Sequence, residues 1–169
     1  MALVVTATAG VLSAAPAQAQ GTWPDKPLKL VVPYPAGGNA DNTARLLATQ
    51  LGQRLGQQVV VDNRPGGSGT IGAAAVAKAP ADGYTLLLDA TAFTVNPSLF
   101  AKLPFDAAKD FAPISLVMQA PLLLVVPTES PFKSVADVVQ AAKARPGQIT
   151  YASAGTGGAQ HLAGELFKQ

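Results

Sequence analysis

The sequence has no cysteine and only one histidine among its 169 residues. Without thiols the chain can form neither disulfide bonds nor thiolate metal sites, and it offers no N-terminal cysteine for a lipid anchor. One imidazole with no thiol beside it does not make a metal site either. We therefore expect no metal site, no cofactor and, after export, a freely soluble protein.

An excess of charge of one sign is also lacking. The chain carries 12 Lys and Arg against 10 Asp and Glu, a net charge of +2, and the basic residues are scattered without forming a run. Nucleic-acid and anionic-membrane surfaces select for concentrated positive charge. No uninterrupted apolar stretch approaches the roughly 20 residues of a transmembrane helix. We expect neither a nucleic-acid partner nor a membrane span.

The chain opens with small, apolar residues. Residues 1–15 lead into Ala17-Gln18-Ala19, the small-x-small pattern that signal peptidase cleaves. We predict a signal peptide over residues 1–19 and a mature protein in the periplasm. The remaining residues, about 150, are enough for a domain with a real core.

The sequence is rich in glycine, and the glycines cluster after strand-like runs. Three such runs pass through glycines into helix-forming stretches: 29–32 before Gly37-Gly38, 59–62 before 66–69, and 149–152 before 155–158. The first N–H groups of a helix lack intrahelical partners, and the helix dipole adds positive charge there. Glycine also lets the backbone approach a ligand closely. Three such junctions indicate that main-chain donors hold a small anion.

The first half of the chain alternates strand and helix. Strands are expected at 29–32, 58–62 and 84–89, and helices at 41–55 and 70–79, stopped by Gly56 and Pro80. This alternation predicts an α/β fold in which helices cover a parallel sheet.

The pattern changes after residue 96. Asn96-Pro97 fits a helix N-cap followed by proline at the first helical position. Strand-like runs at 113–119 and 122–126 lie almost back to back, as in a hinge between two lobes. Ser134 is expected to cap a helix that ends at Pro146-Gly147, before a strand at 149–152. The last helix, from Ala159, has no stop signal, so we expect a first lobe over 20–120 and an incomplete second lobe over 121–169.

Ordered motifs along the chain resemble the Bug-type extracytoplasmic solute receptors of tripartite tricarboxylate transporters. They cover the chain from Trp23 to its end and match about the first half of a family member. In order, they are Val32-Pro33-Tyr34-Pro35-Ala36-Gly37-Gly38 with Asp41 and Ala44-Arg45, Asn63-Arg64-Pro65-Gly66-Gly67-Ser68-Gly69 with Ile71-Gly72, Asp82-Gly83-Tyr84-Thr85-Leu86-Leu87, Asn96-Pro97-Ser98-Leu99-Phe100, Leu103-Pro104-Phe105-Asp106 with Asp110-Phe111, and Tyr151 to Gly157 with His161 to Lys168.

The resemblance implies a two-lobed fold of the type II periplasmic-binding-protein class, with helices on both faces of a parallel sheet. It implies a non-enzymatic, monomeric receptor that closes on a small carboxylate and delivers it to a membrane permease. The solute class stays open among di- and tricarboxylates, amino acids and aromatic acids, and a sensory role is an alternative. The residues expected to bind the ligand are Tyr34, Ala36, Gly37, Gly38, Ser68, Gly69, Thr70, Thr91, Ser153, Ala154, Gly155, Thr156, Gly157 and His161.

Several of these residues have plainer interpretations. Asp41 most simply caps a helix and would support the site by setting the shape of the first glycine loop. Arg64 either pairs with a ligand carboxylate or is a solvated loop arginine. Tyr34 packs over an apolar part of the solute or belongs to the core, and His161 lies near the ligand or only packs its helix.

The sequence also bears on two enzyme classes. A hydrolase is disfavoured because the glycine-x-serine-x-glycine pattern is absent at Ser68 and at Ser153. Gly67, Gly69 and Gly72 fit the dinucleotide-binding spacing, so a dinucleotide-dependent oxidoreductase is the alternative to a receptor. Four residues separate the strand from the first of these glycines, whereas a dinucleotide-binding turn is tight.

Overall fold

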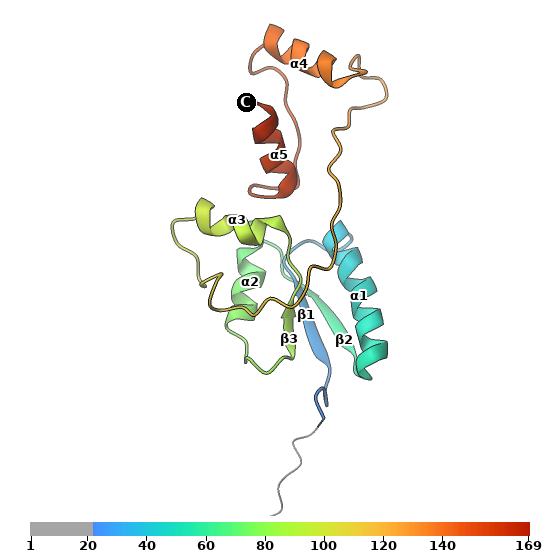
Figure 1. The fold of residues 1–169 in the computed structure, drawn as a ribbon, viewed down its shortest axis with the longest axis vertical. Helices are drawn as coiled ribbons and strands as arrows, with labels where there is room; N and C mark the ends of the chain where they lie inside the picture. Colours follow the sequence, from blue (N-terminus) through green and yellow to red (C-terminus); the bar gives the residue numbers. More distant parts are fainter. Residues whose placement is uncertain (1–21) are drawn as a thin grey trace, which may run out of the picture.

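The computed structural model describes residues 22–169, so the signal peptide predicted over residues 1–19 lies outside the described part. Figure 1 shows helices around a small sheet, with further helices beyond its upper end. The elements are β1 (Leu28–Val32), α1 (Asn39–Leu55), β2 (Val59–Asn63), a short 3-10 turn (Gly67–Gly69), α2 (Thr70–Ala77), β3 (Thr85–Leu87), α3 (Thr91–Leu99), α4 (Val135–Ala144) and α5 (Ala159–Phe167).

The sheet is parallel with the strand order β2-β1-β3. The central strand β1 has the sequence LKLVV and is buried except at Lys29, as expected for a strand covered on both faces. Leu30 and Val32 pack against Ala44 and Ala48 of α1. Helix α2 contacts β1 and β3. Because the chain crosses from β1 outward to β2 and then back to β3, right-handed connections place α1 and α2 on opposite faces.

The α/β fold with a parallel sheet is therefore confirmed, and each early strand and helix lies within a few residues of its predicted position. The helix around Asn96-Pro97 begins earlier than predicted. Helix α3 begins at Thr91 and contains both residues near its end, so Asn96 is not an N-cap. Pro97 lies inside the helix and cannot donate a backbone hydrogen bond. Asn96 is held by a tertiary hydrogen bond to the Ser68 carbonyl instead of a capping one.

The strands predicted at 113–119, 122–126 and 149–152 are wrong for the described residues, where these segments form no strand. A strand exists only where a neighbour accepts and donates its backbone hydrogen bonds, and no described strand runs beside them. Their side chains are exposed, with Ile114 and Leu123 each at 81%. Figure 1 shows residues 112–134 as a long extended connection beside the sheet and up to α4.

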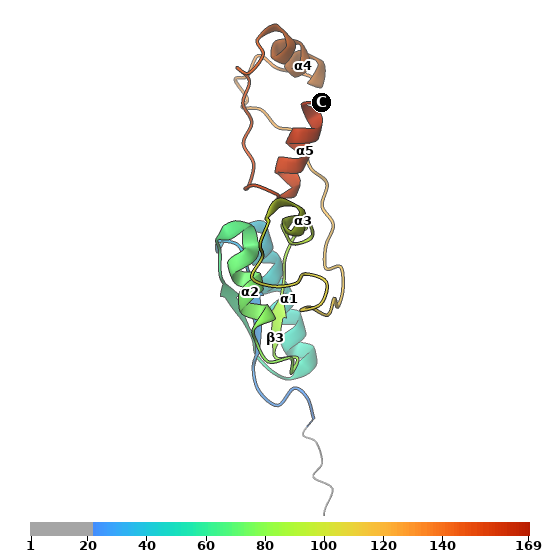
Figure 2. The same ribbon diagram turned by 90° about the vertical axis from the view of Figure 1, so that its left-hand side faces the viewer.

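Helices α4 and α5 lie together beyond the sheet, and Figure 2 shows the same two-part arrangement from the side. Ser134 caps α4 as predicted, because its hydroxyl accepts a hydrogen bond from the Asp137 N–H, and the Asp137 carboxylate accepts one from the Ser134 backbone N–H. This reciprocal pair satisfies two backbone donors at the helix start. No helix in the described part of the chain is both long and apolar enough to cross a membrane.

Candidate functional site

The helix starts gather at one place in the fold. Because β1, β2 and β3 are parallel, α1, α2 and α3 all begin at the carboxyl edge of the sheet. Helix α5 joins them at its own start. A side chain at Gly157, two residues before α5, would collide with Leu99 of α3 at 2.8 Å and lie 3.7 Å from Asn96 Oδ1. The edge of the sheet and the start of α5 therefore meet at α3 (Figures 1 and 2).

These four helix starts share a missing feature. In the described structure no first-turn N–H of α1, α2, α3 or α5 donates a hydrogen bond to an N-cap side chain. Their cap residues are Gly38, Gly69, Ala90 and Gly158. Helix α4, which lies away from this edge, has a complete capping box. Uncapped N-termini keep free N–H groups and partial positive charge. This edge can therefore bind an anion.

Asp41 builds the first loop, between β1 and α1. Gly38 is the N-cap, so the prediction that Asp41 caps the helix is wrong, and Asp41 lies in the first turn. Its buried carboxylate accepts hydrogen bonds from Gly37 N at 2.8 Å, Arg45 Nε at 2.9 Å and Asn63 Nδ2 at 2.9 Å. These donors, Arg45 first, lower the pKa of Asp41 from 3.8 to about 2.

The hydrogen bonds around Asp41 hold the first loop, residues 34–38, in place. Asn63 also donates to the Tyr34 carbonyl, so it joins both ends of the loop. Gly37 has a φ of +82°, in the region that favours glycine, and its N–H is taken by Asp41. Ala36, Gly37 and Gly38 are exposed. Asp41 therefore holds the first loop through the Gly37 N–H, and the loop itself lies at the surface.

The second loop, from Gly66 to Thr70, is tightly wound. Gly66, Gly67 and Gly69 have positive φ, and Ser68 also has a left-handed φ of 53°. A non-glycine residue in this region is uncommon and is kept where the surroundings impose it. The Thr70 hydroxyl donates a hydrogen bond to the Gly67 carbonyl at 2.8 Å, so this side chain stabilises the loop.

Asn96 of α3 is hydrogen-bonded to this second loop. It is 1% exposed, and its amide donates to the Ser68 carbonyl at 2.9 Å. Its Oδ1 is buried with no hydrogen-bond partner among the described residues. Asn96 therefore joins α3 to the loop, while its free oxygen lies near Gly157 at the start of α5.

The Tyr34 side chain is oriented by Asp89, which is not among the ligand-binding residues predicted from the sequence. Its hydroxyl donates to Asp89 Oδ1 at 2.8 Å, across 55 positions of sequence. Burial and the Asp89 carboxylate raise the pKa of Tyr34 well above its usual range. Asp89 follows the end of β3, and this position was the available signal, because ligands bind at the carboxyl ends of parallel strands.

The loop 153–158 forms the remaining side of this region. Residues 153 to 156 are exposed, whereas Gly157 is buried against α3. His161 accepts a hydrogen bond from Gly157 N through Nδ1 at 3.4 Å, and its Nε2 lies 3.9 Å from Glu165. The histidine thus packs the turn at the start of its own helix. Thr91, at the start of α3, is exposed.

Arg64 and Gly72 have structural contacts. Arg64 forms an ion pair with Asp62 at 2.9 Å, as expected for a solvated loop arginine. At Gly72 a side chain would lie 2.8 Å from Pro33 and 3.1 Å from the Arg64 carbonyl. Glycine is needed at this position for α2 to approach β1, which explains part of the dinucleotide-like spacing by packing.

Residues 22–169 offer no better site elsewhere. No group of three or more His, Asp or Glu side chains there is arranged to hold a metal ion. An open groove of about 830 Å³ runs between α1 and β2, lined by residues such as Ala48, Gly52 and Val61. It lies along the side of the sheet, away from the uncapped helix starts, so the carboxyl edge remains the candidate site.

Comparison with known proteins decides the family. The family model described as "Tripartite tricarboxylate transporter family receptor" matches residues 43–169. The chain belongs to this family. Among curated relatives, BugT of Bordetella pertussis is 42% identical over 98% of this chain and 50% of its own length. A protein encoded in the tcbD-tcbE intergenic region of Pseudomonas sp. is 41% identical over 95% of this chain and 48% of its own.

Solved structures agree with this assignment. Rpa4515 of R. palustris, solved with adipate, has a TM-score of 0.82 and 41% identity, covering 86% of this chain and 49% of that one. MatC of Rhodopseudomonas palustris, solved with malate, has a TM-score of 0.73 and 30% identity, covering 86% and 51%. The periplasmic binding protein BugD gives 0.72 and 34%, covering 87% and 50%. The chain thus spans about half the length of these receptors.

Proposed function

We propose that this receptor binds a small carboxylate in the periplasm and delivers it to the membrane subunits of a tripartite transporter. It acts as a monomer and catalyses no reaction. The observation that carries the proposal is the gathering of four uncapped helix starts at one edge, against a complete capping box on α4. Two structural relatives were solved with the carboxylates adipate and malate, which supports an anionic ligand of this class.

The ligand would lie between three loops. Residues 34–38 and 66–70, with Thr91, would form the wall of the first lobe, and Ser153, Ala154, Gly155, Thr156 and Gly157 the wall of the second. Their backbone donors suit a carboxylate because an ionised acceptor binds N–H groups about twice as strongly as a neutral one. The extended stretch 112–134 would connect the lobes and allow them to close on the solute.

The energetics require both walls. A hydrogen bond to a charged group contributes roughly 1.5 to 3 kcal/mol net, and micromolar affinity corresponds to about 8 kcal/mol. Four or five such bonds are needed once ordering costs are included. The 169 residues span about half of a relative, so we expect this length of chain alone to bind weakly.

A thermal-shift screen of the full gene product tests the proposal, using a panel of small carboxylates with phosphate and NAD as comparators. A ligand at 100 times its dissociation constant stabilises by about 2.7 kcal/mol, which raises the melting temperature by several degrees. A shift with one class of carboxylate is the expected result. A shift with NAD alone would favour the dinucleotide alternative, and no shift with any acid would contradict a carboxylate receptor.

A sensory receptor that passes the same solute signal to a regulator is the second candidate, because the binding site would be identical. Uptake of the radiolabelled solute by cells with and without the gene separates the two roles. Loss of uptake on deletion is expected for the transport receptor.

A further inference from the structure

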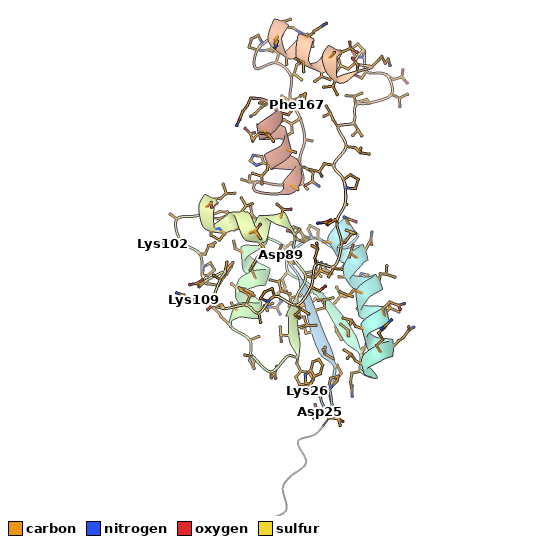
Figure 3. All side chains as sticks on the ribbon, in the orientation of Figure 1. Asp25, Lys26, Asp89, Lys102, Lys109 and Phe167 are labelled. Carbon is orange, nitrogen blue, oxygen red and sulfur yellow. The ribbon has the colours of Figure 1, made fainter. Side chains whose placement is uncertain are left out.

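Asp89 is an unusual residue for an anion site. It lies beside the carboxyl end of β3, beneath α3, where the uncapped helix starts gather (Figure 3). One of its oxygens, Oδ1, accepts hydrogen bonds from the Tyr34 hydroxyl at 2.8 Å and from Ala90 N at 2.7 Å. These two bonds fix the orientation of a negative charge within a region that otherwise offers positive partial charges.

The second oxygen of Asp89, Oδ2, differs from Oδ1 in its hydrogen bonding. No hydrogen bond within residues 22–169 involves Oδ2. Both oxygens face Gly69, the cap residue of α2, where an added Cβ would lie 3.6 Å from Oδ2 and 3.7 Å from Oδ1. A Cβ at position 69 would therefore be in van der Waals contact with the carboxylate, and the glycine leaves that space open. Oδ2 therefore has unused capacity to accept a hydrogen bond beside the second glycine loop.

Asp89 also has no positive partner among the described residues. The cationic groups that form ion pairs there do so with other carboxylates: Arg45 with Asp41, Arg64 with Asp62, Lys109 with Asp106, Lys26 with Asp82, and Lys168 with Glu165. Burial raises the pKa of the Asp89 carboxyl, although its two hydrogen bonds oppose this change. The contrast with Asp41 is direct, because Asp41 has three donors, one of which is cationic.

A partly buried charge without a partner is costly, and it is normally paired or neutralised. A plain dicarboxylate at the proposed site would add a second negative charge near Asp89. A ligand with an ammonium group beside its carboxylate would instead pair with Oδ2 while the helix starts hold its carboxylate. Tyr34 then acts as a positioning residue, because its hydroxyl orients Asp89.

We infer that Asp89 is a specificity-determining residue that selects a carboxylate carrying an amino group. The inference rests on the proposed function and narrows its solute class to amino acids.

Matched ligand pairs test this inference by titration calorimetry on the full gene product. The pairs are succinate and aspartate, glutarate and glutamate, and adipate and 2-aminoadipate, which differ within each pair by one amino group. In the wild type we expect the amino member of at least one pair to bind at least about tenfold more tightly, the effect of one charge-assisted hydrogen bond. This comparison needs no variant, so it does not depend on any variant folding.

Two substitutions assign the preference to Asp89. D89N keeps an acceptor for Tyr34 and Ala90 but removes the charge, and we expect it to reduce the amino preference to within about threefold. D82N is the matched control, because it removes one carboxylate at the opposite end of the sheet, where Asp82 pairs with Lys26. The preference should persist in D82N. Melting curves of both variants check that they are folded.

The outcomes separate the two proposals. Tighter binding of the plain acid in every pair would overturn the inference and indicate that Asp89 binds in its protonated form, while leaving the carboxylate receptor intact. An amino preference that survives D89N would overturn the role of Asp89. Binding by none of the six acids would overturn the proposed function and this inference with it.

Discussion

At the scale of single residues, the proposed site contains two carboxylates that differ in their hydrogen-bond partners. Asp41 is fully engaged by backbone, amide and guanidinium donors and holds the first loop in place. Asp89 is oriented by Tyr34 and Ala90 but has no cationic partner among the described residues. The sequence alone marked Asp41 because it begins a helix next to glycines. It did not connect Asp89 with Tyr34, because that contact joins residues 55 positions apart.

The Asp41 network predicts a pH dependence of stability. The pKa of Asp41 is lowered from 3.8 to about 2 in the folded protein, so its ionised form stabilises the fold above pH about 4. That contribution is lost as the pH falls from about 4 to about 2. We expect D41N to have a lower free energy of unfolding than the wild type at pH 6 and a difference that shrinks toward pH 2. Urea denaturation across this range measures it, and a constant difference would contradict the assignment.

At the scale of elements, the sequence predicted those strands and helices that depend on short-range features of the chain. The strands β1, β2 and β3 and the helices α1, α2 and α4 follow from apolar spacing, glycine or proline stops, and the Ser134 cap. The runs at 113–119 and 122–126 have equally strong β-type sequences and yet form no strand among the described residues. Propensity identifies a possible strand, whereas a strand forms only with a partner, which no local pattern supplies.

The glycine loops allow a matched test at this scale. Gly37 and Gly56 both have left-handed φ, +82° and +67°, and an added Cβ at either would meet no atom within 4 Å. We expect G37A and G56A each to lower the free energy of unfolding by about 1 kcal/mol through backbone strain. Only G37A lies in the first loop, so it alone should weaken carboxylate binding, by about tenfold. Equal effects of both variants on affinity would contradict the placement of the site.

At the scale of the whole molecule, the described chain has a three-stranded sheet with α1, α2 and α3 around it, and α4 and α5 lie beyond the sheet. The sheet and α1 to α3 surround the described core, whereas α4 and α5 have no fully buried residue. The stretch from residue 112 to 134 exposes large apolar side chains, among them Leu123 and Val125. The relatives are about twice as long, and we expect partners for these segments to lie in the length that this chain does not span.

Hydrogen exchange measures this uneven stability directly. In a protein of these 169 residues, amides of β1 should exchange only through global unfolding, because the strand is buried and paired on both sides. Amides of 113–126 should exchange with an opening free energy near zero. Protection of 113–126 comparable to that of β1 would contradict the described structure and indicate an unrecognised partner, such as a second copy of the chain.

The central claim is that main-chain donors at the helix starts recognise an ionised carboxylate. Titration calorimetry of the full gene product with its best acid, and with the amide in which that carboxylate becomes a carboxamide, tests the claim most directly. The amide has nearly the same shape but lacks the charge. We predict at least about tenfold weaker binding of the amide, since charge-assisted hydrogen bonds are lost. Equal affinity for the acid and its amide would contradict the account.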